Sequence, residues 1–373
     1  MTLDSYINDL REKRVAIVGL GVSNRPLLKL LLDAGIRPSV RDRKLGKEDA
    51  LRLEEQGCRV YRGDGYLEEL TEDVIFRTPG LHPFTPALAE AKARGSRLTS
   101  EMEAFFALCP CRIIAVTGSD GKTTTTTVIS ELLKAAGYRV FLGGNIGTPL
   151  LDKVPEMGPE DWAVLELSSF QLHSMECCPD VAVITNVSPN HLDVHPSYED
   201  YQTAKKQIFL RQGPEQLLVL NADNAITRAF AQEAGCRVRL FSRREEPENG
   251  VFCRDGILYR VKDGQVEKLM DAEEIRLPGL HNVENYMAAF AATEGLVPDE
   301  ICCQVAREFP GVAHRLEMIR TLHGVTYCND SIASSPTRTS AGLNALRQKP
   351  IIIAGAMIST FPLTAWEMRS ASM

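Results

Sequence analysis

The sequence lacks a long apolar run, a surplus of basic residues and any C-x-x-C pair. No stretch reaches the roughly 18–20 apolar residues that a helix needs to span a bilayer, and the charged N-terminus, MTLDSYINDLREKR, has no signal-peptide core. The formal net charge of -7 argues against a nucleic-acid or anionic-membrane partner. We therefore expect a cytoplasmic protein, and a monomer, that binds neither nucleic acid nor membrane.

The ten cysteines lack the spacing of a zinc site or a redox motif. In a reducing compartment such cysteines are usually free and buried, and we expect that here. The composition is 44% hydrophobic and 24% charged, which is ordinary for a globular protein. A length of 373 residues suggests two or three domains, each able to bury its own core.

The first segment has the pattern of a doubly wound sheet. Residues 14–18 read as a buried strand, GLGVSN (19–24) as a turn, the next stretch as a helix ending at Gly35, and PSVRD as a strand ending at Asp42. The turn has the first two glycines of a dinucleotide-binding fingerprint but not the third. A phosphate-bearing ligand other than NAD is favoured, and a plain strand–helix turn stays open.

A second strand–loop–helix unit begins at RIIAVT (112–117) and continues into a helix over 123–137. Further strands are expected at 162–167, 181–187 and 216–221, with antiparallel hairpins at two Asp-Gly turns, 255–256 and 263–264. A helix is predicted over 281–296. From about residue 312 the pattern restarts, with a strand at 324–330, a helix at 335–346 and a strand at 350–355.

The loop between that first strand and helix is GSDGKTT, which comprises Gly118, Ser119, Asp120, Gly121, Lys122, Thr123 and Thr124. Small residues let backbone N–H groups approach a phosphate at a helix N-terminus. Lys122 would reach the transferred phosphate, and the Thr123 hydroxyl would bind Mg²⁺. The loop is shorter than the usual phosphate loop, because Val116 stands at the position of the first glycine. A solvated Gly-Lys turn is the plainer alternative.

Acidic and histidine side chains follow neighbouring strands. Glu166 ends one strand, and His191 and Asp193 follow the next, so all three should reach the carboxyl edge where open α/β sheets bind ligands. A carboxylate there can hold the magnesium of a nucleotide, and we favour a metal or phosphate role for His191. Lys205 has apolar neighbours. Its spacing alone predicts no function, so we interpret it at this point as an ordinary solvated lysine on a helix.

Taken together, these motifs resemble the Mur ligases. The order GSDGKTT, GGNIG (143–147), LELSSFQL (165–172), NHLD (190–193), AKKQIF (204–209), HNVEN (281–285), AHRLE (313–317) and NDSIASSPT (329–337) spans most of the chain. The resemblance is greatest to the branch that adds D-glutamate. It implies an α/β protein with a Rossmann-like UDP-sugar-binding domain at 1–108, a P-loop ATPase-like domain at 109–311 and a partial Rossmann-like ligase domain at 312–373.

The resemblance also implies a mechanism and its residues. The carboxylate of UDP-N-acetylmuramoyl-L-alanine would attack ATP, and D-glutamate would then attack the resulting acyl phosphate. Thr123 and Glu166 would hold one Mg²⁺, His191 a second, and Lys205 would be a carbamylated metal ligand. Lys122, His191 and Lys205 are thus the expected catalytic residues. Asn282, Asn285, Arg315 and Asp330 would contact the nucleotide, while the UDP-sugar and the other substrate groups would contact Val22, Ser23, Asp42, Gly80, Asn145, Ser168 and Ser334.

Two features depart from the family pattern. Ile332 stands where the branch often has lysine, which we interpret as a subgroup trait. The tail 356–373 has neither helix nor strand periodicity, and we expect it to be out of frame. A codon string for YDKHIPFDRLGDE, which resembles the family after this strand, gives MISTFPLTAWEMR (357–369) when read one base later. The third domain should then bury too little apolar surface and leave strand edges unpaired.

Three functions remain open from the sequence. The first is the D-glutamate-adding ligase, with activity impaired by the altered C-terminal part. The second is a non-catalytic nucleotide- or UDP-sugar-binding remnant of that enzyme. The third is an NAD(P) dehydrogenase built on GLGVSN, against which the missing glycine and the GSDGKTT loop both count.

Overall fold

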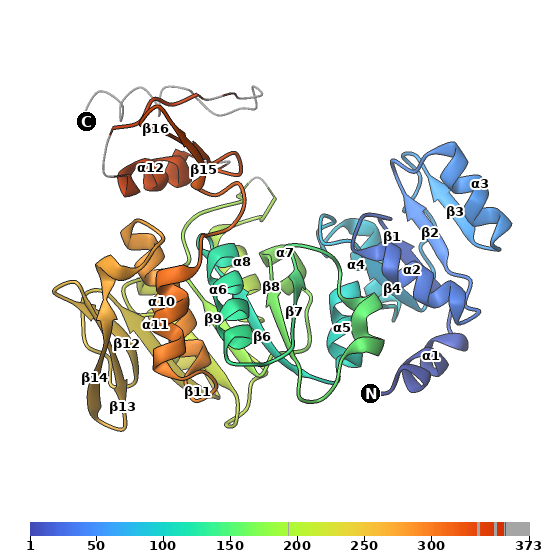
Figure 1. Cartoon of the computed structure of the whole chain (residues 1–373). Helices are drawn as coiled ribbons and strands as arrows, with labels where there is room; N and C mark the ends of the chain where they lie inside the picture. The colour runs from blue at the N-terminus through green and yellow to red at the C-terminus, as the bar shows by residue number, and fades with distance from the viewer. Residues whose placement is uncertain (193, 334–335, 347–348, 354, 356–373) are drawn as a thin grey trace.

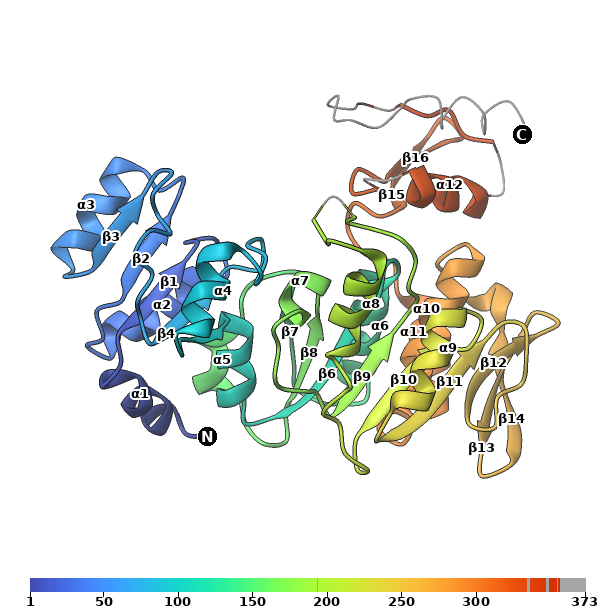
Figure 2. The ribbon, with the colours of Figure 1, turned by 180° about the vertical axis from the view of Figure 1, so that it is seen from behind.

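The computed structural model describes residues 1–192, 194–333, 336–346, 349–353 and 355. In this part of the chain two mainly parallel sheets and an antiparallel hairpin form three units in chain order. Figures 1 and 2 place the smaller parallel sheet at one end, the larger sheet in the middle, and the hairpin over one edge of the larger unit. Asp193, Ser334 and the tail 356–373, about which the sequence made predictions, lie outside the described residues.

The first unit consists of α1 (Leu3–Arg11), β1 (Val15–Val18), α2 (Asn24–Asp33), β2 (Ser39–Asp42), α3 (Lys47–Glu55), β3 (Arg59–Arg62), β4 (Val74–Arg77), α4 (Pro86–Ala93), β5 (Arg97–Thr99) and α5 (Glu101–Leu108). Its strands are all parallel in the order β3-β2-β1-β4-β5. The strand order therefore reverses next to β1, where doubly wound sheets bind their ligands. Strands β1 and β4 are buried throughout, as parallel strands covered by helices should be.

The second unit consists of β6 (Arg112–Thr117), α6 (Lys122–Ala135), β7 (Val140–Gly144), η1 (Leu151–Glu156), β8 (Trp162–Glu166), α7 (Ser169–Leu172), β9 (Val181–Ile184), α8 (Tyr198–Lys206), β10 (Leu217–Asn221), α9 (Ala225–Phe230), η2 (Ala231–Glu233), β11 (Arg237–Ser242), β12 (Gly250–Arg254), β13 (Ile257–Lys262), β14 (Gln265–Asp271), η3 (Ala272–Glu274), α10 (Leu280–Thr293) and α11 (Asp299–Glu308). Its nine strands have the order β14-β13-β12-β11-β10-β9-β6-β8-β7. Every pair from β7 to β12 is parallel, and β13 and β14 extend the sheet antiparallel.

Helices cover both faces of the larger sheet. Helices α6, α10 and α11 lie on the face seen in Figure 1, and α8 and α9 lie on the face seen in Figure 2. Helix α10 packs on the sheet beside α6, contacts both, and is apolar on nearly every side, with Tyr286 and Phe290 fully buried. This packing fixes α6, and with it the loop that precedes α6, against the middle of the sheet.

Both expected Asp-Gly hairpins are present. Asp255 and Gly256 have φ of 51° and 75°, and Asp263 and Gly264 have φ of 50° and 74°. Two successive positive φ values are what a type I′ turn requires, and its twist matches that of the flanking strands. The turns join β12 to β13 and β13 to β14, so the hairpins are part of the larger sheet.

The third unit is the hairpin β15 (Glu317–Leu322) and β16 (Val325–Asn329), followed by α12 (Pro336–Ala345). Strand β16 and the helix were expected, whereas β15 was missed. The predicted strand at 350–355 was wrong, because its described residues form no strand and Ile353 is 99% exposed. An apolar run becomes a strand only where a neighbouring strand pairs with it. Among the residues that the structure describes, each strand of this two-stranded sheet pairs on one edge only, as expected.

Two expectations drawn from what the sequence lacks can be compared with the structure. All ten cysteines are free, as predicted, but only Cys58, Cys111, Cys302 and Cys303 are buried, so burial was wrong for the rest. Within the described ranges, every helix is too short or too polar to cross a bilayer.

Candidate active site

The loop after β6 is built around two glycines with left-handed backbone angles. Gly118 has φ 148° and Gly121 has φ 82°. A Cβ atom on Gly118 would lie 1.9 Å from the Thr185 hydroxyl oxygen, and one on Gly121 would lie 2.3 Å from the Asn285 amide oxygen. Both positions therefore require glycine, for backbone angle and for space.

Buried side chains hold the rest of this loop in shape. The Ser119 hydroxyl is fully buried and lies 2.9 Å from the Tyr201 hydroxyl. The Asp120 amide donates to the Asn186 side chain at 3.0 Å, and the Thr185 hydroxyl donates to the Asp120 carbonyl at 2.5 Å. Thr124 is also buried in the first turn of α6. Ser119 and Thr124 thus support the loop from within, and the backbone N–H groups and the start of the helix remain to attract an anion.

A hydroxyl and a carboxylate meet at the start of α6. The Thr123 hydroxyl donates to Glu166 Oε2 at 2.7 Å, and the Asn145 amide donates to Glu166 Oε1 at 2.8 Å. Glu166, the last residue of β8, is 2% exposed. Hydroxyl and carboxylate oxygens are the ligands that Mg²⁺ takes beside nucleotide phosphates. The residues present therefore fit a magnesium-bound triphosphate, and they bring Asn145 to the metal side of the site.

Two lysines reach the same loop carbonyl. Lys122 Nζ donates to the carbonyl oxygens of Gly118 and Ser119 at 3.0 and 3.1 Å. Lys205 Nζ, from the last turn of α8, donates to the Gly118 carbonyl at 2.8 Å and lies 4.5 Å from the centre of the Tyr201 ring. No local pattern singles out Lys205, yet the fold places its amine in contact with the loop 118–124.

Burial sets the charge state of Lys205. Its side chain is fully enclosed, and this desolvation, together with repulsion from the Lys122 ammonium, holds the Lys205 pKa well below its ordinary value of 10.5. Asp120 and Glu166 oppose this shift only in part. The amine of Lys205 is therefore far more readily neutral than that of an exposed lysine, and a neutral amine is nucleophilic.

His191 lies in the exposed loop after β9. Its φ is 55°, and its ring lies 5.3 Å from the ring of Phe170, centre to centre. The described contacts place it beside the α7 region, and its role as ligand of a second Mg²⁺ stays a prediction.

A cavity of about 230 Å³ opens between the phosphate loop, α10 and the third unit. Asn285 lines this cavity, accepts from the Thr125 hydroxyl at 3.2 Å and donates to Asn282 at 3.2 Å, so Asn282 lies directly behind it. Arg315 and Asp330 line it from the opposite side. Segments far apart in sequence thus meet here, as a nucleotide site between two domains requires.

Four of the predicted UDP-sugar residues lie at the carboxyl edge of the first sheet, whereas the fifth, Asn145, follows β7 in the second sheet. Asp42 accepts from the backbone amides of Leu20 and Lys44, both at 2.7 Å, and so fixes the turn 19–24. Val22 at the tip of this turn is 73% exposed, Ser23 is half-buried and Gly80 is exposed.

Ser168 belongs to the second unit and serves first as the N-cap of α7. Its hydroxyl accepts from the Gln171 amide, and the Gln171 side chain accepts from the Ser168 backbone in return, which is a capping box. Ser168 is half-buried, two residues beyond Glu166. Contact between this serine and a substrate stays a prediction.

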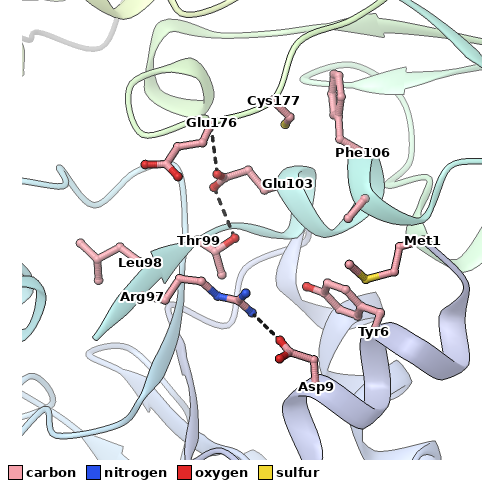
Figure 3. A pocket seen from close by; sticks show the side chains of 11 residues that line it. Met1, Tyr6, Asp9, Arg97, Leu98, Thr99, Glu103, Phe106, Glu176 and Cys177 are labelled. Carbon is pink, nitrogen blue, oxygen red and sulfur yellow. Dashed lines mark hydrogen bonds and ion pairs between the residues drawn. The ribbon is translucent and has the colours of Figure 1, made fainter. Parts of the chain in front are cut away.

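A second cavity, of about 280 Å³, contains none of the predicted site residues. Figure 3 shows it between α1, β5, α5 and the segment after α7, with Glu103 and Arg97 pointing toward it. Burial raises the Glu103 pKa, and Arg97 pairs with Asp9 at 3.5 Å. None of its lining residues belongs to the phosphate site.

Sequence reasoning missed several residues that shape this site. Thr185 and Asn186 hold the Asp120 segment, and they follow a strand directly, so the carboxyl-edge argument applied to Glu166 identifies them too. Tyr201 supports both Ser119 and Lys205, and His281 lines the nucleotide cavity. No local pattern marks Tyr201, because its role depends on how α8 packs against the loop.

Comparisons with known proteins agree with this arrangement. The model of the Mur ligase MurD-like N-terminal domain matches residues 13–100, and that of the Mur ligase middle domain matches residues 116–293. A UDP-N-acetylmuramoylalanine--D-glutamate ligase from Acetivibrio thermocellus is 48% identical over 372 residues, covering 97% of this chain and 79% of the relative. The chain belongs to the Mur ligase family.

A second Mur ligase relative supports the same branch. The UDP-N-acetylmuramoylalanine--D-glutamate ligase of Ruminiclostridium cellulolyticum is 46% identical over 364 residues, covering 96% of this chain and 78% of its own length. A solved UDP-N-acetylmuramate-alanine ligase from Thermotoga maritima has a TM-score of 0.54 at 18% identity, covering 89% of this chain and 77% of that one. That likeness shows the fold alone. The expected α/β class, with Rossmann-like and P-loop-like units, is confirmed.

Proposed function

We propose that this chain uses ATP to join D-glutamate to UDP-N-acetylmuramoyl-L-alanine, forming an amide bond in peptidoglycan precursor synthesis. The observation that carries the proposal is the Thr123–Glu166 pair at the mouth of the glycine loop, with a hydroxyl and a carboxylate 2.7 Å apart. Family membership and the names of the two relatives support the same reaction. ATP is abundant in the cytoplasm, and we place the reaction there.

The reaction needs two displacements, and the site residues position rather than bond to the reactants. The muramoyl-alanine carboxylate attacks the γ-phosphorus of ATP, the bond to ADP breaks, and an acyl phosphate forms. The amine of D-glutamate then attacks the acyl carbon, loses a proton, and phosphate leaves. Magnesium supplies charge neutralisation at the transferred phosphate. Lys122 and the loop amides hold that phosphate, and Thr123 and Glu166 hold the ion.

Lys205 supports a second metal position in this proposal. A neutral Lys205 amine attacks the carbon of CO₂, forms an N–C bond and loses a proton, which leaves a carbamate with one negative charge. Complete burial and a lowered pKa favour the neutral amine that this step needs. His191 is the proposed partner ligand, and its exposed loop would have to bring it toward Lys205.

The remaining predicted residues take the outer parts of the two substrates. Asn282, Asn285, Arg315 and Asp330 surround the nucleotide in the cavity between the units. Val22, Ser23, Asp42 and Gly80 hold the UDP-sugar, and Asn145 and Ser168 contact the muramoyl end. The domain boundaries near residues 108 and 311 belong to the same proposal.

The test measures phosphate release by the 373-residue chain with ATP, Mg²⁺ and UDP-N-acetylmuramoyl-L-alanine, offering D-glutamate, L-alanine or D-alanyl-D-alanine in turn. We expect release to depend on D-glutamate. Lys122→Met should lower turnover by about 10²–10³-fold, because a preorganised cation at the transferred charge is lost.

Lys134→Met is the matched control, since Lys134 lies in the last turn of the same helix, where its exposed side chain pairs with Glu131. It should retain wild-type turnover. Release that is independent of the amino acid, or full turnover by Lys122→Met, would contradict the proposal. ATP binding without release under any condition would support the non-catalytic remnant instead.

A further inference from the structure

Three histidine rings from two units of the chain surround one carboxylate. His82 lies in the loop after β4, His173 follows α7, His195 precedes α8, and Asp200 lies in the first turn of α8. The ligand atoms of all four lie within 4.8 Å of one another. None of the four residues belongs to the proposed nucleotide, magnesium or UDP-sugar sites.

The carboxylate is the centre of this cluster. His173 Nε2 lies 2.8 Å from Asp200 Oδ1, and His195 Nδ1 lies 2.6 Å from Asp200 Oδ2. His82 Nε2 approaches the same Oδ2 at 3.8 Å. A tetrahedral ion with bonds of about 2 Å needs donor atoms roughly 3.3 Å apart. The four donor atoms lie within 4.8 Å of one another, so the most widely separated pair must approach by roughly 1.5 Å to bind such an ion.

The surroundings of His195 already resemble those of a metal ligand. Its Nε2 lies 2.9 Å from the hydroxyl of Ser169, and its ring stacks on Phe170 at 5.2 Å. Its side chain is fully buried. Histidine ligands usually use one ring nitrogen for the ion and the other to donate to an oxygen, which fixes the tautomer. The Ser169 bond leaves Nδ1 facing the cluster in that arrangement.

We propose that this cluster binds one divalent first-row transition-metal ion such as Zn²⁺. His173, His195 and Asp200 are the core ligands, and His82 completes the tetrahedron. Imidazole nitrogen suits zinc, copper, nickel and cobalt, whereas Mg²⁺ and Ca²⁺ prefer an all-oxygen shell. The site is therefore chemically distinct from the Thr123–Glu166 pair and does not compete with it for magnesium.

His82 is the weakest of the four ligands. Its Nδ1 accepts the Phe84 backbone N–H at 3.2 Å, which places the ring proton on Nε2. That Nε2 is buried and has no hydrogen-bond partner among the described residues. To bind the ion through Nε2, His82 must move its proton to Nδ1 and give up the Phe84 bond. His82 should therefore contribute less to the binding free energy of the ion than the other three ligands do.

The ion would tie the first unit to the second. His82 is the one ligand from the loop after β4, and the other three come from the segments flanking α7 and α8. Arg77, just before this loop, already donates to the Phe170 carbonyl at 2.9 Å and to Ser174 at 2.7 Å. Zinc should therefore raise the thermal midpoint of the chain by stabilising this junction.

The test uses the full chain stripped of metal, with Zn²⁺ titrated against a chromogenic chelator and Co²⁺ followed by its visible absorption. We expect one tight site per chain with tetrahedral nitrogen–oxygen cobalt bands. Asp200→Asn, which keeps the shape but loses the charge, and His173→Gln should each weaken zinc binding at least about tenfold. His82→Gln should weaken it less and remove most of the zinc-dependent rise in the thermal midpoint.

Thiols are the competing zinc ligands, because the Cys109 and Cys111 sulfurs lie 3.3 Å apart. The double variant Cys109→Ser, Cys111→Ser is the control and should bind zinc as the parent does. Zinc binding that survives in both folded variants, Asp200→Asn and His173→Gln, overturns the proposal. So does loss of binding in the cysteine variant, or a sulfur-to-cobalt charge-transfer band. Circular dichroism checks folding, and either variant suffices if the other fails to fold.

Discussion

Two glycine turns occupy equivalent places in the two parallel sheets, yet they are held in different ways. The turn 19–24 follows β1 and depends mainly on Asp42, which accepts the Leu20 amide at 2.7 Å. The Asn24 amide group donates back to the Gly19 carbonyl at 2.8 Å. The tip of the turn, at Val22, is open to solvent. The Gly19 N–H also donates to the Arg41 carbonyl at 2.7 Å, so the turn is anchored at its base while its tip is exposed.

The loop 118–124 follows β6, and each of its residues is buried or half-buried. Ser119 has no solvent exposure, and Thr185 and Asn186 hold the Asp120 segment from the neighbouring strand end. Lys205 reaches the loop from below. Transferring a phosphoryl group requires dipoles fixed before the reaction, whereas holding the distant end of a substrate does not. The difference in support thus matches the difference in proposed role.

The largest effect is expected from replacing Gly118, in the loop 118–124, with alanine. Gly118→Ala places a methyl group 1.9 Å from the Thr185 hydroxyl oxygen and keeps a φ of 148° that alanine avoids. Backbone strain and overpacking should together lower the free energy of unfolding by about 2–4 kcal/mol. Turnover should fall at least about 100-fold, because the loop amides move. Urea unfolding and phosphate release measure the two effects.

Gly21→Ala is the counterpart in the other turn. Gly21 has no positive φ, and the nearest atom to an added Cβ would be the Thr78 hydroxyl oxygen at 3.9 Å. Stability should change by no more than about 0.5 kcal/mol. Equal losses in the two variants would mean that the turns are equally constrained, which would remove the contrast between them.

Lys205→Met should have smaller effects, and they should differ in sign: turnover should fall while stability rises. Turnover should fall about 10–100-fold as the proposed metal ligand is lost. The free energy of unfolding near neutral pH should rise by about 1–4 kcal/mol, because a buried amine whose charged form is strongly desolvated is replaced by an apolar chain of similar length. A variant that is both less active and less stable would show that Lys205 supports the loop rather than the reaction.

The pH dependence sharpens this test. The Lys205 pKa is lowered well below 10.5 in the folded chain, so between that lowered pKa and 10.5 the unfolded chain binds one more proton. The stability of the parent therefore rises with pH through this window, and it is lost as the pH falls. Lys205→Met lacks this slope, and its advantage should shrink as the pH approaches 10.5. Unfolding in CO₂-free buffers keeps the amine unmodified.

Much of the fold was predictable because it depends on local patterns. Buried strands, the GSDGKTT loop and the two Asp-Gly turns follow from residue periodicity and turn chemistry. The strand expected at 350–355 was wrong because apolar composition alone does not supply a pairing partner. Edge elements such as β3, whose residues are only half-buried or exposed, were missed because they have no apolar run to mark them.

The candidate site was predictable only where a residue directly follows a strand. Glu166 was predicted because it ends a strand, and Lys122 because it lies in the GSDGKTT loop, whereas Tyr201 and the enclosure of Lys205 depend on how α8 packs against the loop. The histidine cluster was missed for the same reason. His82 and His173 are distant in sequence, and only contact between the two units brings them to Asp200.

The smallest effect is expected from the carboxylate that supports the open turn. Asp42→Asn replaces one acceptor oxygen with an NH₂ group, so the amide of Leu20 or Lys44 loses its charged acceptor. Such a bond contributes about 1.5–3 kcal/mol, but the exposed turn can adjust and bind water. We expect the KM for UDP-N-acetylmuramoyl-L-alanine to rise about tenfold, with the KM for ATP and the turnover number unchanged. Val22→Ala, at the exposed tip, should change the KM for the UDP-sugar less than about threefold. A rise in the KM for ATP with Asp42→Asn would mean that the open turn and the enclosed loop are coupled, and that the two sites do not bind their ligands independently.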